Sequence, residues 1–332
     1  MFFENTIITV ISLSTPLIIA VIGETISEKS GVINLSAEGT IMISALTGFV
    51  FGYITDIALV GFIAGTICGA SIAFFISICD IKLRMDQIAV GFVLTILCIH
   101  LSNYLGQDYV RINGPLVTKF SIPIISEIPI LGKVLFNHSL ITYFSIILIP
   151  SSWFFINKTN LGLSIRASGE NPQAARSRGI NVKKMRLMGT VIGGSLLGLA
   201  GATFSLYTKY GWSESHTANY GWIILAIVIF GGWNPYRAAT GAYAFGLLQV
   251  LAIKAQSVTL ALSQILPLLP FPIMIFILIF IQYINKTDRK NLPNFILSIL
   301  GGNQPESLGR KLPEDFKWYE RNNYKWYKSF VG

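Results

Sequence analysis

The sequence predicts an all-α fold, a polytopic membrane helix bundle of about 8–10 transmembrane helices in which some helices are broken or re-entrant. Two compositional observations point to it. The 332 residues are 52% hydrophobic and only 12% charged, whereas soluble domains carry roughly 25% charged residues. Mean hydropathy is +0.61. A third observation is that apolar segments follow one another from residue 6 to residue 285 and leave no room for a separate globular domain.

These observations divide the chain into a transmembrane domain, residues 1–284, and a tail, residues 285–332. The first apolar run is interpreted as a membrane span and not as a secretory signal, because Glu4 stands where a signal peptide carries basic residues. Residues 5–23 are uncharged over about the length of a spanning helix.

A charged, glycine-containing stretch follows the first span. Residues 23–39, GETISEKSGVINLSAEG, carry Glu24, Glu28, Lys29 and Glu38. Such a stretch is incompatible with an ordinary lipid-facing helix. It is either a loop outside the bilayer or irregular backbone that enters the membrane, shielded by protein or facing a water-filled cavity.

Further apolar segments are expected at residues 39–55, 57–79, 88–107, 140–157, 187–208 and 238–253. The segment at 221–230 is too short to span alone and ends in GGWNPYR, which predicts a broken or shallow helix. Prolines divide the uncharged run at 255–285, so we expect a re-entrant piece and then a final helix at about 271–284. Glycines repeat at small-xxx-small spacing at positions 61, 65 and 69, and again at 194 and 198, which predicts close helix packing.

The basic residues set the orientation. Residues 157–186 hold seven basic residues and one acidic residue, Glu170, so the positive-inside rule places this loop in the cytoplasm. The basic and aromatic tail belongs there too, and the Pro- and Gly-rich loop at 108–138 is placed outside. The same rule accounts for the net charge of +9, so no nucleic-acid partner is inferred. Simple alternation gives nine crossings with an outer N-terminus, whereas one more crossing at the broken second helix gives ten with both ends inside.

Within the basic loop, residues 168–186, SGENPQAARSRGINVKKMR, resemble a short helix on a membrane face. Asn171 suits the N-cap, Pro172 the first helical position, and Gly179 the left-handed residue after the last turn. So short a helix is marginal in water, so packing against the membrane domain or a partner is expected to hold it. The alternative is a solvated loop with good caps.

Several motifs of catalytic, nucleotide-binding and metal sites are missing from the sequence. There is no GxxxxGK[ST], HExxH, CxxC or GxSxG motif, which argues against an enzyme, a cofactor and a metal site. Cys68, Cys79 and Cys98 lie in or beside apolar segments and are interpreted as small buried hydrophobes. The spans are nearly free of acidic residues, which argues against an ion-coupled carrier.

Three stretches together resemble the permease subunits of ATP-binding-cassette importers, in the branch for simple sugars, nucleosides and branched-chain amino acids. They are residues 23–39, GENPQAARSRGIN at 169–181 and AIVIFGGWNP at 226–235. The ESLGRKLPE stretch at 306–314 is similar to the tail motif of nucleoside-type permeases.

This resemblance implies that the capped loop is the coupling helix that docks on a separate ATPase subunit. The implied contact residues are Glu170, Asn171, Pro172, Ala174, Ala175, Arg176, Gly179 and Ile180. It also implies a broken helix beside the translocation path, with Asn34 and Glu38 as candidates to line it or to hold the break. Trp233 and Asn234 are weaker candidates.

The function implied is import of a nucleoside or related purine compound, driven by that ATPase. The implied partners are the ATPase, a second, non-identical permease, an extracytoplasmic substrate-binding protein and the lipid bilayer. The implied location is the bacterial inner membrane, multi-pass, with both termini in the cytoplasm, which favours ten crossings over nine. A simple-sugar permease of the same branch is the alternative, and branched-chain amino acids are less favoured. An ion-coupled carrier or a channel would act without any ATPase.

Overall fold

The computed structural model describes residues 2–115, 117–121, 137–214, 217, 219–256, 272, 275–276, 279 and 304–312. The helices are α1 (Phe2–Lys29), α2 (Ala37–Thr55), α3 (Ala58–Ile81), α4 (Gln87–Leu105), α6 (Leu140–Lys158), α7 (Asn160–Glu170), α8 (Pro172–Ser177), α9 (Val182–Thr203), α10 (Tyr220–Phe230) and α11 (Pro235–Gln256). The remaining elements are a 3-10 turn, η1 (Gln107–Tyr109), a π-helical turn, η3 (Phe204–Thr208), and two antiparallel strands, β1 (Lys119–Ser121) and β2 (Asn137–Ser139).

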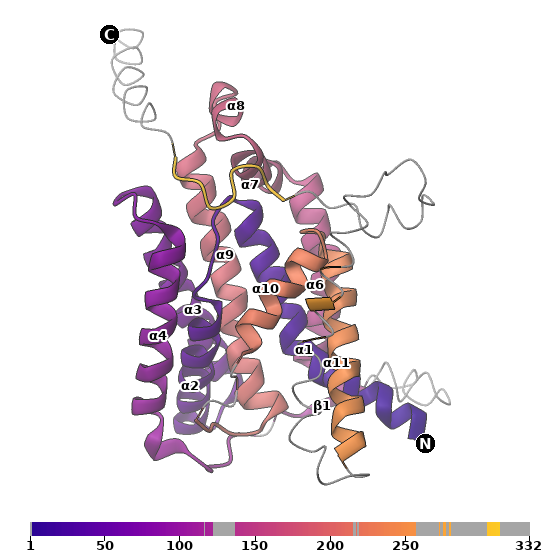
Figure 1. The fold of residues 1–332 in the computed structure, drawn as a ribbon. Helices are drawn as coiled ribbons and strands as arrows, with labels where there is room; N and C mark the ends of the chain where they lie inside the picture. The colour runs from indigo at the N-terminus through magenta and orange to yellow at the C-terminus, as the bar shows by residue number, and fades with distance from the viewer. Residues whose placement is uncertain are drawn as a thin grey trace.

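Six helices of the described residues are long and apolar enough to cross a membrane, counting η3 as the continuation of α9. They are α1, α2, α3, α4, α6 and α9, and they run side by side along the long axis of the molecule (Figure 1). The expected all-α membrane bundle is therefore confirmed. Of the helix expected at 271–284, only residues 272, 275–276 and 279 are described, and they are helical; most of the tail lies outside the described residues.

The six spanning helices form an inner and an outer group. In the most apolar windows of α1, α2 and α9, 61%, 72% and 61% of the residues are buried, against 28% in α3, α4 and α6. The outer helices expose large apolar side chains such as Ile67 and Phe92, as expected of a surface that meets lipid.

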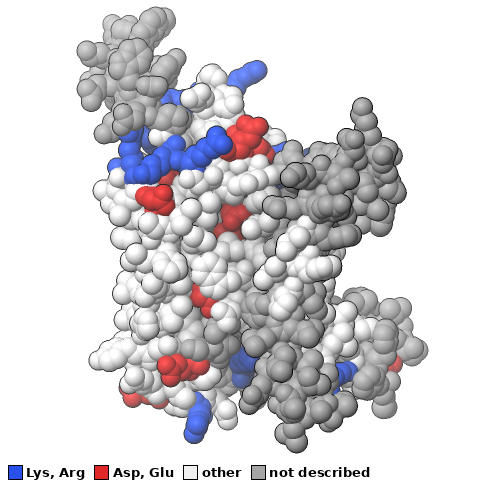
Figure 2. All heavy atoms as spheres, viewed as in Figure 1, with Lys and Arg blue, Asp and Glu red and all other residues white. Residues whose placement is uncertain are grey.

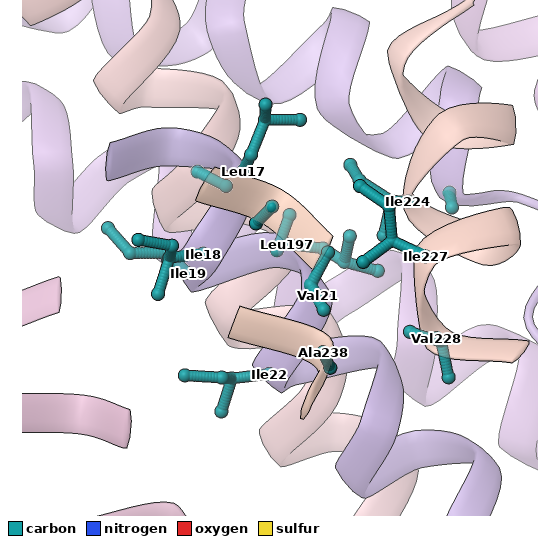
Figure 3. Packing of buried hydrophobic residues seen from close by; sticks show 14 of the residues in the cluster. Leu17, Ile18, Ile19, Val21, Ile22, Leu197, Ile224, Ile227, Val228 and Ala238 are labelled. Atoms are coloured by element: carbon teal, nitrogen blue, oxygen red, sulfur yellow. The ribbon is translucent and has the colours of Figure 1, made fainter. Parts of the chain in front are cut away.

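The largest core cluster lies where α1 meets α9, α10 and α11. Figure 3 shows Leu17 and Val21 of α1 gathered with Leu197 of α9 and with Ile224 and Ile227 of α10. Helix α10 has 11 residues, which rise about 16 Å, or half of a bilayer core. It is therefore the short helix that the sequence predicted, and it is held by this packing.

Glycine contacts join α3 to α9, as the small-xxx-small spacing predicted. A Cβ atom added at Gly65 would lie 2.7 Å from Cβ of Ala202 and 3.0 Å from the carbonyl oxygen of Gly198. One added at Gly69 would lie 2.6 Å from Cα of Gly198. These distances leave no room for a side chain, so the two backbones touch directly.

The break after α1 is shorter than the sequence indicated. Helix α1 continues through Glu24 and Glu28 to Lys29, and only residues 30–36 separate it from α2. Glu24 and Glu28 are 0% and 3% exposed. The first part of the stretch is therefore helix shielded by surrounding protein, and the irregular backbone is limited to residues 30–36.

The basic loop is also more ordered than predicted. Residues 157–186 contain the end of α6, the whole of α7 and α8, and the first five residues of α9. Helix α7 was not expected from the sequence. Its buried residues recur at three- and four-residue spacing, at Gly162, Ile165, Ser168 and Gly169, so a helical periodicity was present in the sequence.

The ends of the molecule differ. Helix α8 lies at one end of the bundle and the beginning of α1 lies at the other, whereas residues 304–312 lie on the side of α8 (Figure 1). On the face in Figure 2, Lys and Arg lie toward the two ends, with the larger group near α8. The beginning of α1 is thus not on the side of α8, contrary to the arrangement with both termini on one side that the resemblance favoured.

Candidate functional site

Helix α8 has the caps that the sequence predicted. The Asn171 side-chain oxygen accepts a hydrogen bond from the Ala174 backbone N–H at 3.0 Å, and Pro172 occupies the first turn. Gly179 has φ +82°, and its N–H donates to the Arg176 carbonyl at 2.8 Å. Local side chains therefore start and stop this helix at fixed residues.

One side of α8 packs against the protein, and the other side is exposed. Ala175 is 4% exposed and packs with Val182, with Ala167, Ile180 and Leu312 around them. The outward residues Gln173, Ala174, Ser177, Arg178 and Gly179 are exposed. The helix forms a short projection at the end of the molecule, as Figure 1 shows.

Two residues of the predicted ATPase contact are charged. Glu170 lies just before α8 begins, and Arg176 lies in the last turn of α8. Glu170 is the last residue of α7, and its Oε1 lies 3.8 Å from Nε of Arg166, one helical turn earlier. Both side chains are partly exposed, so this pair contributes about 0–1 kcal/mol. Arg176 is half-buried on α8.

Asn34 closes the break between α1 and α2. Its side-chain oxygen accepts from the hydroxyl of Ser36 at 2.6 Å and from the Ser36 backbone N–H at 3.2 Å. Its amide nitrogen donates to the Glu24 carboxylate at 3.2 Å. With 1% of its surface exposed, Asn34 provides hydrogen-bond partners inside the protein where the helix is interrupted.

Glu38 caps a helix other than its own. One carboxylate oxygen accepts from the backbone N–H of Asn219 and the other from that of Gly221, each at 2.6 Å. These N–H groups are at the N-terminal end of α10, where no helical carbonyl is available to them. A negative charge is also favourable at that end of the helix dipole.

Trp233 holds the opposite end of α10. Its indole N–H donates to the Glu28 carboxylate at the end of α1. Asn234 starts α11, because its side-chain oxygen accepts from the Tyr236 backbone N–H at 3.0 Å. Carboxylates of the 23–39 stretch therefore bind α10 at both ends. Asn34, Trp233 and Asn234 lie in helix breaks, whereas Glu38 lies in the first turn of α2.

A buried ion pair near α8 was missed in the sequence, where Arg186 counted only as a basic loop residue. Arg186 lies in the second turn of α9 with 0% of its surface exposed, and its Nη1 is 3.6 Å from Oδ2 of Asp80 in α3. Asp80 also accepts from the side-chain amide of Gln87 at 2.9 Å. The two charges come from helices far apart in the chain, so no local pattern identified them.

No metal centre is visible in the described part of the chain, where no three His, Cys, Asp or Glu side chains are grouped to hold an ion. Cys79 and Cys98 are buried and Cys68 is half-buried, and all three are free thiols.

The family described as branched-chain amino acid transport system permease component matches residues 6–278. The putative glucose ABC transporter permease protein TsgC13 of Haloferax volcanii is 37% identical over 77% of this chain and 79% of its own length. The nucleoside ABC transporter permease protein NupC of Lactococcus lactis is 34% identical, and the guanosine ABC transporter permease protein NupQ of Bacillus subtilis is 33% identical, each over 72% of this chain and 79% of its own length.

No solved structure matches the chain. The family match covers most of the sequence, and the relatives match both in sequence and over most of their length. The chain therefore belongs to the family of branched-chain amino acid transport system permease components, in the branch of ABC transporter permeases for nucleosides and simple sugars.

Proposed function

We propose that this permease imports a nucleoside or related purine compound and that α8 is the coupling helix for a separate ATPase subunit. The observation that carries the coupling role is the capped projection at one end of the bundle, with one side packed and the other free. A short helix fixed in this way moves as a rigid body when a partner displaces it.

The proposed ATPase contact consists of the residues of the capped loop. They are Glu170, Asn171, Pro172, Ala174, Ala175, Arg176, Gly179 and Ile180. Ala175 and Ile180 face the cluster behind α8, so their proposed part is to support the helix. The outward residues meet the partner directly.

The proposed assembly contains four kinds of subunit. This chain and a second, non-identical permease form the two halves of the pore, the ATPase binds α8, and an extracytoplasmic protein delivers the cargo. Permeases of this family are transport subunits, so ATP hydrolysis is assigned to the partner. In the bacterial inner membrane, α8 and the tail at 285–332 then face the cytoplasm.

Asn34, Glu38, Trp233 and Asn234 stay candidates for positions beside the translocation path. Their hydrogen bonds favour the view that they hold the helix breaks open at fixed geometry. Broken helices are tolerated in membranes where the freed backbone groups find partners in the protein.

Two cargo classes remain to be separated. NupC and NupQ are named for nucleosides, which supports the proposal, whereas TsgC13, with 37% identity, is named for glucose. A simple sugar is therefore the second candidate.

The test is uptake of labelled guanosine and labelled glucose by cells that express the permease with its ATPase, second permease and binding protein. In Arg176→Glu, we expect guanosine uptake and co-purification of the ATPase to fall about tenfold or more, because reversing an interface charge costs several kcal/mol. The control is Lys158→Glu, the same charge change at the exposed end of α6.

Unchanged uptake and ATPase binding in Arg176→Glu and in Glu170→Ala would contradict the coupling role of α8. Glucose uptake without guanosine uptake would favour the sugar class. Uptake that persists after deletion of the ATPase would contradict the ATP-driven importer and favour a carrier.

A further inference from the structure

We propose that residues 304–312, named here the strap, are a positioning element that fixes the coupling helix to the membrane bundle, so that displacement of α8 is transmitted to α1 and α9. This inference rests on the proposed coupling role of α8. The strap comes from the chain beyond α11, yet it lies against the end of the bundle that carries α8 (Figure 1).

The strap is bonded first to the ends of α1 and α7. The Ser307 backbone N–H donates to the Gly169 carbonyl at 3.0 Å, and the Ser307 hydroxyl donates to the same oxygen at 2.6 Å. The Gly309 N–H donates to the Gly31 carbonyl at 3.3 Å. A Cβ atom at Gly31 would lie 3.0 Å from the Ser307 hydroxyl, so the glycine leaves the space that the strap occupies.

The strap also provides hydrogen-bond acceptors for Arg186. Nη1 of this buried guanidinium donates to the Arg310 carbonyl at 3.0 Å, and Nη2 donates to the Ser307 hydroxyl at 3.2 Å. The charged partner of Arg186 is Asp80. Further hydrogen bonds lower the cost of burying an ion pair, and here the strap provides acceptors for Nη1 and Nη2.

This network reaches the first helix break. Gln87 donates to Asp80 at 2.9 Å, and its side-chain oxygen accepts from the backbone N–H of Ile33 at 2.9 Å. Ile33 lies between α1 and α2. The strap, the ends of α3 and α9 and the break are therefore joined by hydrogen bonds and by the Arg186–Asp80 ion pair inside the protein.

Apolar contacts pin the strap at two places. Leu308 packs on the main core cluster around α1. Leu312 packs on Ala175 and Val182, directly behind α8. Because Leu312 and Ser307 are in one short segment, the underside of α8 is tied to the Arg186 network without any intervening helix.

A purely structural strap and a positioning strap predict different results. Loss of a structural contact lowers the amount of folded permease, and transport and ATP hydrolysis then fall in proportion. Loss of a positioning contact leaves the assembled transporter in place and lowers the cargo moved per ATP hydrolysed. The ratio of these two rates is therefore the informative quantity.

The experiment uses the whole transporter in vesicles and compares Leu312→Ala with Gln304→Ala, an exposed position of the same segment. We expect Leu312→Ala to keep the ATPase bound and to lower cargo per ATP about threefold or more, the size of effect seen along coupled elements. Leu312→Met should restore the ratio, and Gln304→Ala should not change it. An unchanged ratio in Leu312→Ala would overturn the inference.

A cross-link covers the case in which Leu312→Ala fails to fold. In a chain without its native cysteines, Leu312→Cys and Ala175→Cys are joined by oxidation. We expect transport to continue with the bond closed, because strap and α8 move as one; transport that stops on closure and returns on reduction would overturn the proposal. If Arg176→Glu loses coupling while the strap variants keep the native ratio of cargo to ATP, only the role of the strap is contradicted. If Arg176→Glu behaves like the native protein, the coupling role of α8 is contradicted.

Discussion

At the scale of single residues, the buried acids of the 23–39 stretch are explained by the hydrogen bonds they receive. A carboxylate inside a membrane protein is costly unless donors surround it. Glu24 has the amide of Asn34, Glu28 has the indole of Trp233, and Glu38 has two backbone N–H groups of α10. Each acid therefore stabilises a particular interruption of a helix.

Glu38→Ala is expected to destabilise the protein more than Glu38→Gln. Alanine leaves the N–H groups of Asn219 and Gly221 without an acceptor, and each unsatisfied buried group costs about 1–3 kcal/mol. Glutamine keeps one acceptor oxygen. Thermal unfolding of the purified permease in detergent should give the order native, Glu38→Gln, Glu38→Ala, and equal unfolding temperatures would show that Glu38 does not support α10.

At the scale of elements, close packing decides which face of α3 meets α9. Between helices in a membrane there is little hydrophobic driving force, so backbone proximity and van der Waals contact replace it. The glycines of α3 and α9 allow that proximity, whereas the apolar side chains of α3 on its other side are exposed to lipid.

Gly65→Leu should disrupt the contact between α3 and α9. The new side chain would occupy space filled by Ala202 and the Gly198 backbone, and overpacking of this kind costs about 1–3 kcal/mol or more. Ile67→Leu is the matched control, because Ile67 lies on the same helix with 60% of its surface exposed. A lower yield and unfolding temperature only in Gly65→Leu is the expected outcome; normal behaviour of that variant would contradict the packing.

At the scale of the whole molecule, the positions of α8 and of the beginning of α1 bear on topology. They lie at opposite ends of the bundle (Figure 1). With α8 in the cytoplasm, as proposed, α1 begins outside, which agrees with the outer N-terminus of the simple alternation.

Labelling of intact cells with a membrane-impermeant maleimide tests this topology. In a background without Cys68, Cys79 and Cys98, the reagent should label Asn5→Cys, at the start of α1, and should label Ser177→Cys, on α8, only after the cells are opened. The three native cysteines lie within α3 and α4. Replacing them leaves the introduced cysteine as the labelled thiol. Labelling of both positions, or of neither, in intact cells would contradict opposite locations.

Side chains that act within a few residues made part of the site predictable. The caps Asn171 and Gly179 act on backbone groups of the same turn, so α8 could be predicted from its own residues. Helix α7 was missed because its apolar residues are few and the basic residues of the surrounding stretch, 157–186, indicated a loop. The bounds of the first break were wrong because surrounding protein shields Glu24 and Glu28, which lets the helix continue through them.

The sequence by itself determined the class of the protein, the approximate spans and the capped helix, because hydropathy and capping depend on neighbouring residues. Only the tertiary structure decided that Glu38 caps α10, that Arg186 is a buried partner of Asp80, and that residues 304–312 reach the underside of α8. These contacts join segments far apart in the chain. Their formation depends on how the helices pack, and that packing is not encoded in any single stretch.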